Sequence, residues 1–195
     1  CGGEITEGAI DNSIRHCLTK LSHFHFVSSD IHKKRVIQMG EVPKNVYCVG
    51  GLGVDNIRTT SLYTKSVLEK KLNLKFLKRI ILVTYHPETL KKKSSLSNLK
   101  NLFKALKTMQ ETTVIFTMPN SDIESIIIYN TILKFISRRK NYHLFNSLGQ
   151  KKYYSCCKYS DFMIGNSSSG IIESMIYKKP SINILPRQKG RQSNK

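Results

Sequence analysis

Three consecutive hydroxyl side chains and a glycine stand between a short apolar run and a helical pattern. They are Ser167 to Ser169 and Gly170, in the stretch DFMIGNSSSGIIESM. Serine caps helices and glycine permits tight turns, so the start of a helix is one explanation. The alternative is an anion site, because hydroxyls and the unpaired N–H groups of a helix N-terminus favour negative charge. The spacing is not that of a Walker motif, so a diphosphate fits better than a nucleoside triphosphate.

Charged residues accompany this motif. Glu173 falls on the first turn of the expected helix, where it either stabilises the helix N-terminus or accepts hydrogen bonds from sugar hydroxyls such as those of a ribose. Past the next strand, the loop RQKGR contains Arg187 and Arg191. A forked guanidinium there suits a phosphate or a leaving group, although taken alone the loop is only basic.

Two further polar residues follow other expected strands. They are His86 in VTYHPET and Asn120 in TMPNSD. A lone loop histidine is most often solvated, and Asn120 is also explained by an Asx turn. Because the carboxyl ends of parallel strands meet at one edge of a sheet, we expect His86, Asn120 and Ser167 to lie along the same edge. That convergence favours a binding site over three unrelated caps.

A third group of chemically capable residues lies near the amino end. The stretch GGEITEGAIDNSIRHCLTKL contains Asp11, Arg15 and His16. Asp11 and Arg15 are four residues apart, so an ion pair on the surface of a helix explains both. If the start of that helix faces a cleft, Asp11 is instead a candidate general acid or base.

The elements that would position these residues alternate in type. From Lys78 onward, apolar β-branched runs alternate with helical periodicity, which is typical of a parallel sheet with right-handed crossovers. The sequence predicts strands at 79–85, 112–118, 142–145, 161–165 and 181–185, and helices at 96–109, 125–139, 151–159 and 171–177.

The first sixty residues have the pattern of the end of a similar unit. Helices are expected at 12–21 and 31–39, with strands at 23–29 and 45–50. Residues 61–77 are polar and lack a clear strand, which indicates an interdomain connection. The prediction is therefore an α/β protein whose two Rossmann-like domains occupy residues 1–60 and 78–195.

The net charge of +19 raises the alternative of a basic nucleic-acid-binding module. The lysines are scattered in short groups without interleaved aromatic residues, so solvated faces explain them better. A basic cleft that collects a small polyanion remains a milder functional interpretation. We therefore expect that the protein does not bind nucleic acid.

Other signals concern compartment and metals. The five cysteines include no C-x-x-C pair and no histidine partner at zinc spacing, so free thiols and no metal site are expected. Cys156 and Cys157 are adjacent on an expected helix, which favours ordinary packing. Neither a membrane-spanning run nor a basic-then-apolar leader is recognised, so a cytoplasmic protein is the expectation.

Several motifs together resemble the hydrolysing UDP-N-acetylglucosamine 2-epimerases, which make N-acetylmannosamine or a related sugar for sialic-acid-type pathways. The motifs are GGEITEGAIDNSIRHCLTKLSHFHFVSS, VYCVGGLGVDNI, VTYHPET, MPNSD, MIGNSSSGIIE and INILPRQKGR, and the resemblance extends over essentially the whole chain. It implies two Rossmann-like domains of the glycosyltransferase-B type, with UDP held chiefly by the second domain and no cofactor. It also implies elimination of UDP to a glycal, followed by addition of water with inversion at C2.

The resemblance carries roles onto single residues. Asp11 corresponds to an acidic position implicated in acid–base work, and His86 to the active-site histidine of the family. Ser167 and Ser168 correspond to hydroxyls that bind the diphosphate, Gly170 and Asn120 lie in the UDP motifs, and Glu173 corresponds to the acid that binds the ribose. Arg187 and Arg191 correspond to the basic loop, and Arg15 and His16 to a motif on the sugar side.

Some expectations stay open at this point. Family members run considerably longer, so the resemblance implies a fragment, with the first domain incomplete and the second lacking its end. Cys1 replaces a His or Glu, and NSDIES lacks a glycine of the family pattern. The sequence does not separate UDP-N-acetylglucosamine from a UDP-diacetamido sugar, and a glycosyltransferase of the same fold is the enzyme alternative. A homo-oligomer of the full-length enzyme is also left open.

Overall fold

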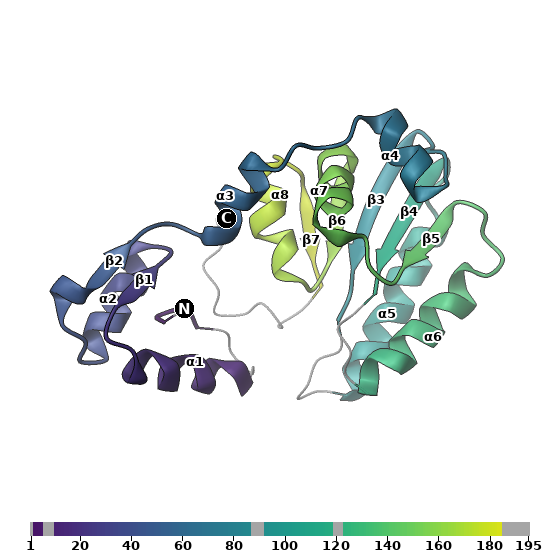
Figure 1. The fold of residues 1–195 in the computed structure, drawn as a ribbon. Helices are drawn as coiled ribbons and strands as arrows, with labels where there is room; N and C mark the ends of the chain where they lie inside the picture. Colours follow the sequence, from purple (N-terminus) through teal and green to yellow (C-terminus); the bar gives the residue numbers. More distant parts are fainter. Residues whose placement is uncertain (1, 6–9, 87–91, 119–122, 185–195) are drawn as a thin grey trace. The chain divides into compact units, whose positions relative to one another are not determined.

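The computed structural model describes residues 2–5, 10–86, 92–118 and 123–184. The chain divides between Thr59 and Thr60 into two compact units, each of which is described by itself. Helices and strands alternate through both units (Figure 1). The predicted α/β alternation is therefore confirmed.

The first unit contains a small parallel sheet. Strands β1 (His25–Val27) and β2 (Val46–Cys48) pair in parallel. Val27 and Val46 of the strands pack with Val36, from the helix between them, to form the buried core of this unit. The helices of this unit are α1 (Ile10–Leu21), α2 (Asp30–Gln38) and α3 (Leu52–Thr59), with the 3-10 turn η1 (Pro43–Asn45).

The second unit is built on a five-stranded sheet in which every strand pair is parallel. Its strand order is β5-β4-β3-β6-β7. The strands are β3 (Arg79–Thr84), β4 (Thr112–Thr117), β5 (Tyr142–Phe145), β6 (Phe162–Gly165) and β7 (Ser181–Asn183). All five strand predictions are confirmed, with ends that agree or differ by at most two residues.

Helices cover both faces of this sheet. They are α4 (Lys65–Leu72), α5 (Lys92–Lys107), α6 (Ile123–Ile136), α7 (Gly149–Tyr159) and α8 (Ile172–Ile176), with the 3-10 turn η2 (Ser168–Gly170). Ile81 and Val83 of β3 pack with α5 and α6, whereas Ile80 and Leu82 pack with α4 and α7. Strands buried on both faces explain why the sequence shows continuous apolar runs rather than alternation.

Two helices have no counterpart in the sequence-based prediction. They are α3 and α4, and α4 lies inside the polar segment 61–77. Thr64 caps α4 and Asn73 ends it in the left-handed conformation, while Leu68 and Leu72 are buried. Leu68 and Leu72 are the two buried residues of α4, and two apolar positions are too few to give a clear periodic signal. Residues Thr60–Leu185 form the second unit.

Candidate functional site

The carboxyl ends of β3, β4 and β6 lie side by side in the second unit. Thr84 of β3 pairs with Thr117 of β4 and with Gly165 of β6. The hydroxyl oxygens of Thr84 and Thr117 are 2.9 Å apart, which is a hydrogen bond between neighbouring strands. A pocket at this edge is lined by Thr84, Gly165, Ser167 and Gly170, among others. The carboxyl ends of these three strands therefore converge at one edge of the sheet, as the order of the elements predicted.

His86 is half-buried two residues past the end of β3, and Asn166 holds its backbone. The N–H of His86 donates to Oδ1 of Asn166 at 2.7 Å, and Nδ2 of Asn166 donates to the carbonyl oxygen of His86 at 2.8 Å. Asn166 is fully buried, and its own N–H donates to the carbonyl oxygen of Thr84 at 3.2 Å. One asparagine thus fixes the strand end and the loop that carries the histidine.

Gly165, which precedes Asn166, approaches β3 too closely for any side chain. Its φ is +154°, and a Cβ atom built on it would overlap the carbonyl oxygen of Thr84. The glycine therefore serves the contact between two strands of the protein. At Gly170, by contrast, an added Cβ would meet Ser181 at the ordinary distance of 3.8 Å.

The three serines form a 3-10 turn rather than the first turn of a long helix. The side chain of Ser167 accepts the N–H of Ser169 at 3.3 Å. The N–H groups of Gly170 and Ile171 bond to the carbonyl oxygens of Ser167 and Ser168. These backbone donors are used inside the turn, and α8 has only five residues. Because a serine hydroxyl that accepts one bond keeps its own proton, hydroxyls rather than a helix end are the donors that the geometry supports.

Glu173 lies half-buried beside this turn. Burial raises the pKa of its carboxyl, while hydrogen bonds from its own backbone and from Ser169 oppose that rise. Ser169 is buried, and its hydroxyl bonds to the phenol of Tyr153 from α7. Burial also raises the pKa of Tyr153. Tyr153 is thus protonated at neutral pH and braces the turn that carries the serines.

Sequence reasoning gave no role to Asn166 or Tyr153. Asn166 stood inside a motif whose serines explained it sufficiently, and Tyr153 is separated from Ser169 by sixteen residues. The signal that was present is the position of Asn166 directly after a predicted strand, where a buried amide needs partners from a neighbouring strand. The contact of Tyr153 follows only from the packing of α7 on the sheet.

Asp11, Arg15 and His16 lie on α1 in the first unit. Nη1 of Arg15 bonds to Oε2 of Glu4 at 2.9 Å, so Arg15 has an acidic partner eleven residues away. The predicted pair with Asp11 stays untested, because the side chain of Asp11 lies outside the described part of the chain. Nδ1 of His16 is buried and has no hydrogen-bond partner among the described residues.

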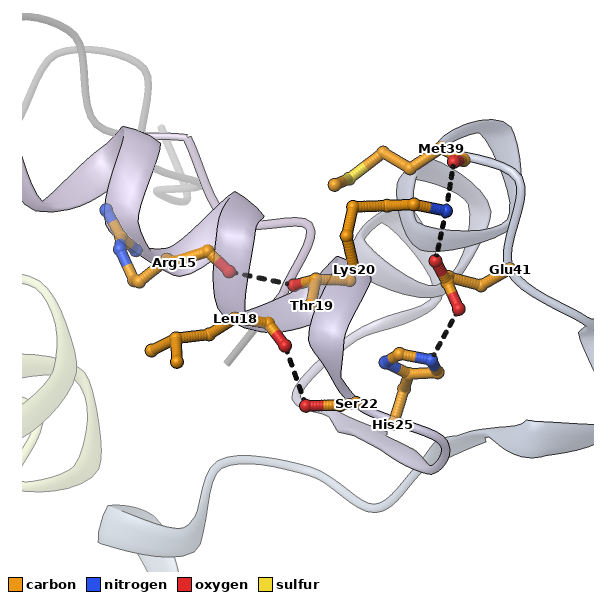
Figure 2. A network of polar contacts seen from close by, with 8 residues as sticks. All are labelled: Arg15, Leu18, Thr19, Lys20, Ser22, His25, Met39 and Glu41. Carbon is orange, nitrogen blue, oxygen red and sulfur yellow. Dashed lines mark hydrogen bonds and ion pairs between the residues drawn. The ribbon is translucent and has the colours of Figure 1, made fainter.

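A polar network fixes the other end of α1 (Figure 2). Nζ of Lys20 donates to the Glu41 carboxylate at 2.6 Å and to the carbonyl oxygen of Met39 at 3.1 Å. The other carboxylate oxygen of Glu41 lies 3.0 Å from Nε2 of the buried His25. Lys20 holds the pKa of Glu41 below its ordinary value. The network ties α1 to β1 and to the end of α2, which steadies the helix that carries Arg15 and His16.

Three predicted site residues fall outside the described residues. They are Asn120, Arg187 and Arg191. The structure therefore brings together His86, Ser167, Ser168, Gly170 and Glu173 within one unit. The remaining predicted residues stay sequence-based predictions.

Other chemistry is limited in the part of the chain that the structure covers. Within 2–5, 10–86, 92–118 and 123–184, no three His, Cys, Asp or Glu side chains gather as a metal site requires. Cys17, Cys48, Cys156 and Cys157 are free thiols. Burial in α7 raises the pKa of Cys156 to about 12, which suits packing rather than reactivity. Among the same residues, no helix has the length and apolar character needed to span a bilayer.

Comparison with known proteins gives related sequences. The profile of the UDP-N-acetylglucosamine 2-epimerase family matches residues 1–195. The GDP/UDP-N,N'-diacetylbacillosamine 2-epimerase (hydrolyzing) of Campylobacter jejuni is 46% identical over 194 residues, which cover 98% of this chain and 50% of the relative. Polysialic acid biosynthesis protein P7 of Escherichia coli is 40% identical over 191 residues, covering 97% and 48%. The chain thus spans about half the length of the curated relatives it matches.

A solved structure gives the fold. The UDP-GlcNAc 2-epimerase of Neisseria meningitidis bound to UDP-GlcNAc is similar to this chain with a TM-score of 0.76. The similarity covers 93% of this chain and 51% of that one, at 16% sequence identity. Identity that low shows the fold alone. The predicted fold class, Rossmann-like domains of the glycosyltransferase-B type, is confirmed.

Proposed function

This chain belongs to the UDP-N-acetylglucosamine 2-epimerase family, and on that premise we propose that the protein is a hydrolysing UDP-sugar 2-epimerase. The reaction releases UDP and a free sugar with inverted configuration at C2. The geometry that supports this function is the meeting of the His86 loop with the Ser167–Gly170 turn, which Asn166 joins at the carboxyl ends of the strands. Ligands bind at that edge of open parallel sheets.

The reaction has two steps, an elimination and an addition. In the first, a base removes the proton at C2, the electron pair forms the C1–C2 double bond, and the C1–O bond breaks so that UDP leaves with its electrons. In the second, water adds across the glycal, with hydroxide joining C1 and a proton joining C2. The steps need a general acid or base near the sugar and hydrogen-bond donors around the departing diphosphate.

Each candidate residue has a place in this scheme. We assign acid–base work to Asp11 and His86, and the sugar side to Arg15 and His16. The hydroxyls of Ser167 and Ser168 donate to the diphosphate, beside Gly170. Glu173 accepts hydrogen bonds from the ribose. Burial raises the pKa of its carboxyl, and hydroxyl donors of a bound ribose would favour the charged form. Asn120, Arg187 and Arg191 complete the UDP site.

Two substrates of the same class stand out. UDP-N-acetylglucosamine is the first candidate, and its product is N-acetylmannosamine, a precursor for sialic-acid-type sugars. The second is UDP-N,N'-diacetylbacillosamine, which appears in the name of the Campylobacter relative at 46% identity. Both present the same UDP to the serine turn and differ only at the sugar. A cytoplasmic location, where nucleotide sugars are made, completes the proposal.

Incubation of the whole protein with each UDP-sugar, without an acceptor, tests the function. We expect UDP and a free 2-epimeric sugar, and in D₂O a deuterium atom at C2 of the product, because solvent supplies that proton. Strict dependence on an added sugar acceptor would instead indicate a glycosyltransferase. Calorimetric titration of UDP into this chain tests the nucleotide site separately. UDP binding that tRNA displaces would favour the nucleic-acid alternative.

A further inference from the structure

His86 owes its backbone position to a side chain from elsewhere in the sequence. Its N–H and its carbonyl oxygen both bond to the amide of Asn166, at 2.7 and 2.8 Å, across 80 residues of sequence. An amide that donates and accepts at once fixes both hydrogen-bonding groups of one residue. With these two groups fixed, the backbone orientation of His86, and hence the direction of its Cα–Cβ bond, is set.

The same asparagine is joined by a peptide bond to the serine turn. Its N–H also bonds to Thr84, and the side chain of Ser167 begins the turn one residue later. Because Asn166 is fully buried, these bonds do not compete with water. The histidine loop and the turn therefore have a common rigid anchor.

On the premise of the proposed function, we infer that Asn166 is a positioning residue that sets the distance between His86 and the diphosphate bound at Ser167 and Ser168. It touches neither the sugar nor the reacting atoms. Asn166 holds the acid–base group, His86, at a fixed distance from the leaving UDP, whose diphosphate is positioned by the neighbouring serine turn. A misplacement of about 1 Å at such a group can reduce turnover on the order of 100-fold.

Asn141 provides a matched control. Its Nδ2 donates to the carbonyl oxygen of Thr112 at 2.9 Å, at the amino ends of β4 and β5. Asn141→Ala therefore also deletes an amide bonded to a neighbouring strand, but at the opposite edge of the same sheet. This variant is the reference for a loss of stability that leaves the position of His86 unchanged.

The experiment compares Asn166→Ala with Asn141→Ala in the whole protein, at a temperature where both are folded. We expect the kcat of Asn166→Ala to fall by about 10- to 100-fold, as misplacement predicts. The affinity for UDP and the KM should stay near the values of the unsubstituted protein. Asn141→Ala should keep its kcat. The pH profile of kcat should shift in Asn166→Ala alone, because the surroundings of His86 change.

Three results would overturn the inference. The first is equal kcat in the two variants, and the second is a parallel loss of kcat and UDP affinity, which would place the effect in the turn. The third is unchanged protection of the His86 N–H against hydrogen exchange in Asn166→Ala, a measurement that needs no activity. If Asn166→Ala does not fold, Asn166→Asp keeps the size and the acceptor oxygen but replaces the donor to the His86 carbonyl oxygen with a second, ionisable oxygen, so a fall in kcat at neutral pH is expected for this variant as well. An unchanged kcat in Asn166→Asp would overturn the inference. An unsubstituted protein that binds UDP but releases no sugar would refute the proposed function, while the exchange measurement still decides whether Asn166 anchors His86.

Discussion

At the scale of single residues, burial and hydrogen bonding decide which polar groups are available for chemistry. Asn166 uses both its amide oxygen and its amide nitrogen on the backbone of His86, whereas the hydroxyl of Ser167 accepts one bond and keeps its proton. Glu173 is held in surroundings that disfavour its charge. Such a carboxylate gains more than an exposed one from donors that a ligand brings.

Glu173→Gln should raise stability at neutral pH and weaken UDP binding. The unfolded carboxyl ionises near the ordinary value of 4.5, but the folded one ionises only at higher pH because its pKa is raised. Its contribution to stability is thus complete below pH 4.5 and is lost as the pH rises through the folded pKa. Melting curves at about pH 4 and about pH 7 should show a gain for Glu173→Gln only at the higher pH.

The affinity for UDP should fall about 10- to 100-fold in the same variant, since a hydrogen bond to a charged group is lost. Calorimetry with UDP and with 2′,3′-dideoxy-UDP separates the causes. The unsubstituted chain should distinguish the two ligands, and Glu173→Gln should not. Glu111→Gln, which changes an exposed carboxylate of the same unit, is the control. Full discrimination by Glu173→Gln would remove Glu173 from the ribose site.

At the scale of elements, the site depends on how closely β6 lies against β3. Gly165 permits that approach, and the two following residues carry the asparagine and the first serine of the turn. Any movement of β6 away from β3 would therefore also move the serine turn away from His86. The packing of β6 on β3 therefore determines the geometry of the site.

Gly165→Ala should destabilise the second unit and impair UDP binding together. The new methyl group would overlap the carbonyl oxygen of Thr84, which belongs to the backbone and has no rotamer to adopt. Overpacking of this kind costs about 1 to 3 kcal/mol, and more when backbone must shift. Urea unfolding monitored by circular dichroism measures it. Gly53→Ala, in α3 with open space around it, should be neutral or stabilising by up to about 1 kcal/mol. Equal effects of the two substitutions would contradict this reasoning.

Much of the element order could be read from the sequence, because buried parallel strands give continuous apolar runs. The strand at 79–85 and the helix at 151–159 were placed within two residues. The 3-10 turn at Ser168–Gly170 could not be predicted, because capping residues indicate where a helix starts but not how long it is. The hydrogen bonds between the Asn166 side chain and the backbone of His86 could not be predicted, because no local sequence pattern encodes a contact between residues 80 positions apart.

At the scale of the whole molecule, the boundary between the two units lies before α4. Leu68 of α4 is fully buried against the sheet face that also packs α7. Tyr63 reinforces this attachment, because its N–H bonds to Ser155 and its carbonyl oxygen accepts from the hydroxyl of Tyr159. Helix α4 therefore contributes to the stability of the second unit.

Leu68→Ala should lower the unfolding free energy of the second unit by about 2 to 5 kcal/mol, the usual cost of deleting a buried leucine side chain. Hydrogen exchange resolved by residue should show faster exchange in β3 and α7, with no change in α2. Val67→Ala is the control, because Val67 is adjacent and 38% exposed. A uniform loss of protection in both units, or none in β3, would place α4 outside the second unit.

The strand order also has a consequence for synthesis on the ribosome. Strands β3, β4 and β5 can pair in the order in which they emerge, but β6 must add to the other side of β3 much later. The hydrogen bonds between His86 and Asn166 can form only after β6 has been synthesised, 80 residues after His86. Such long-range closure is a slow step in folding. A nascent chain in which only β3, β4 and β5 have paired therefore still lacks the contact that fixes the backbone of His86.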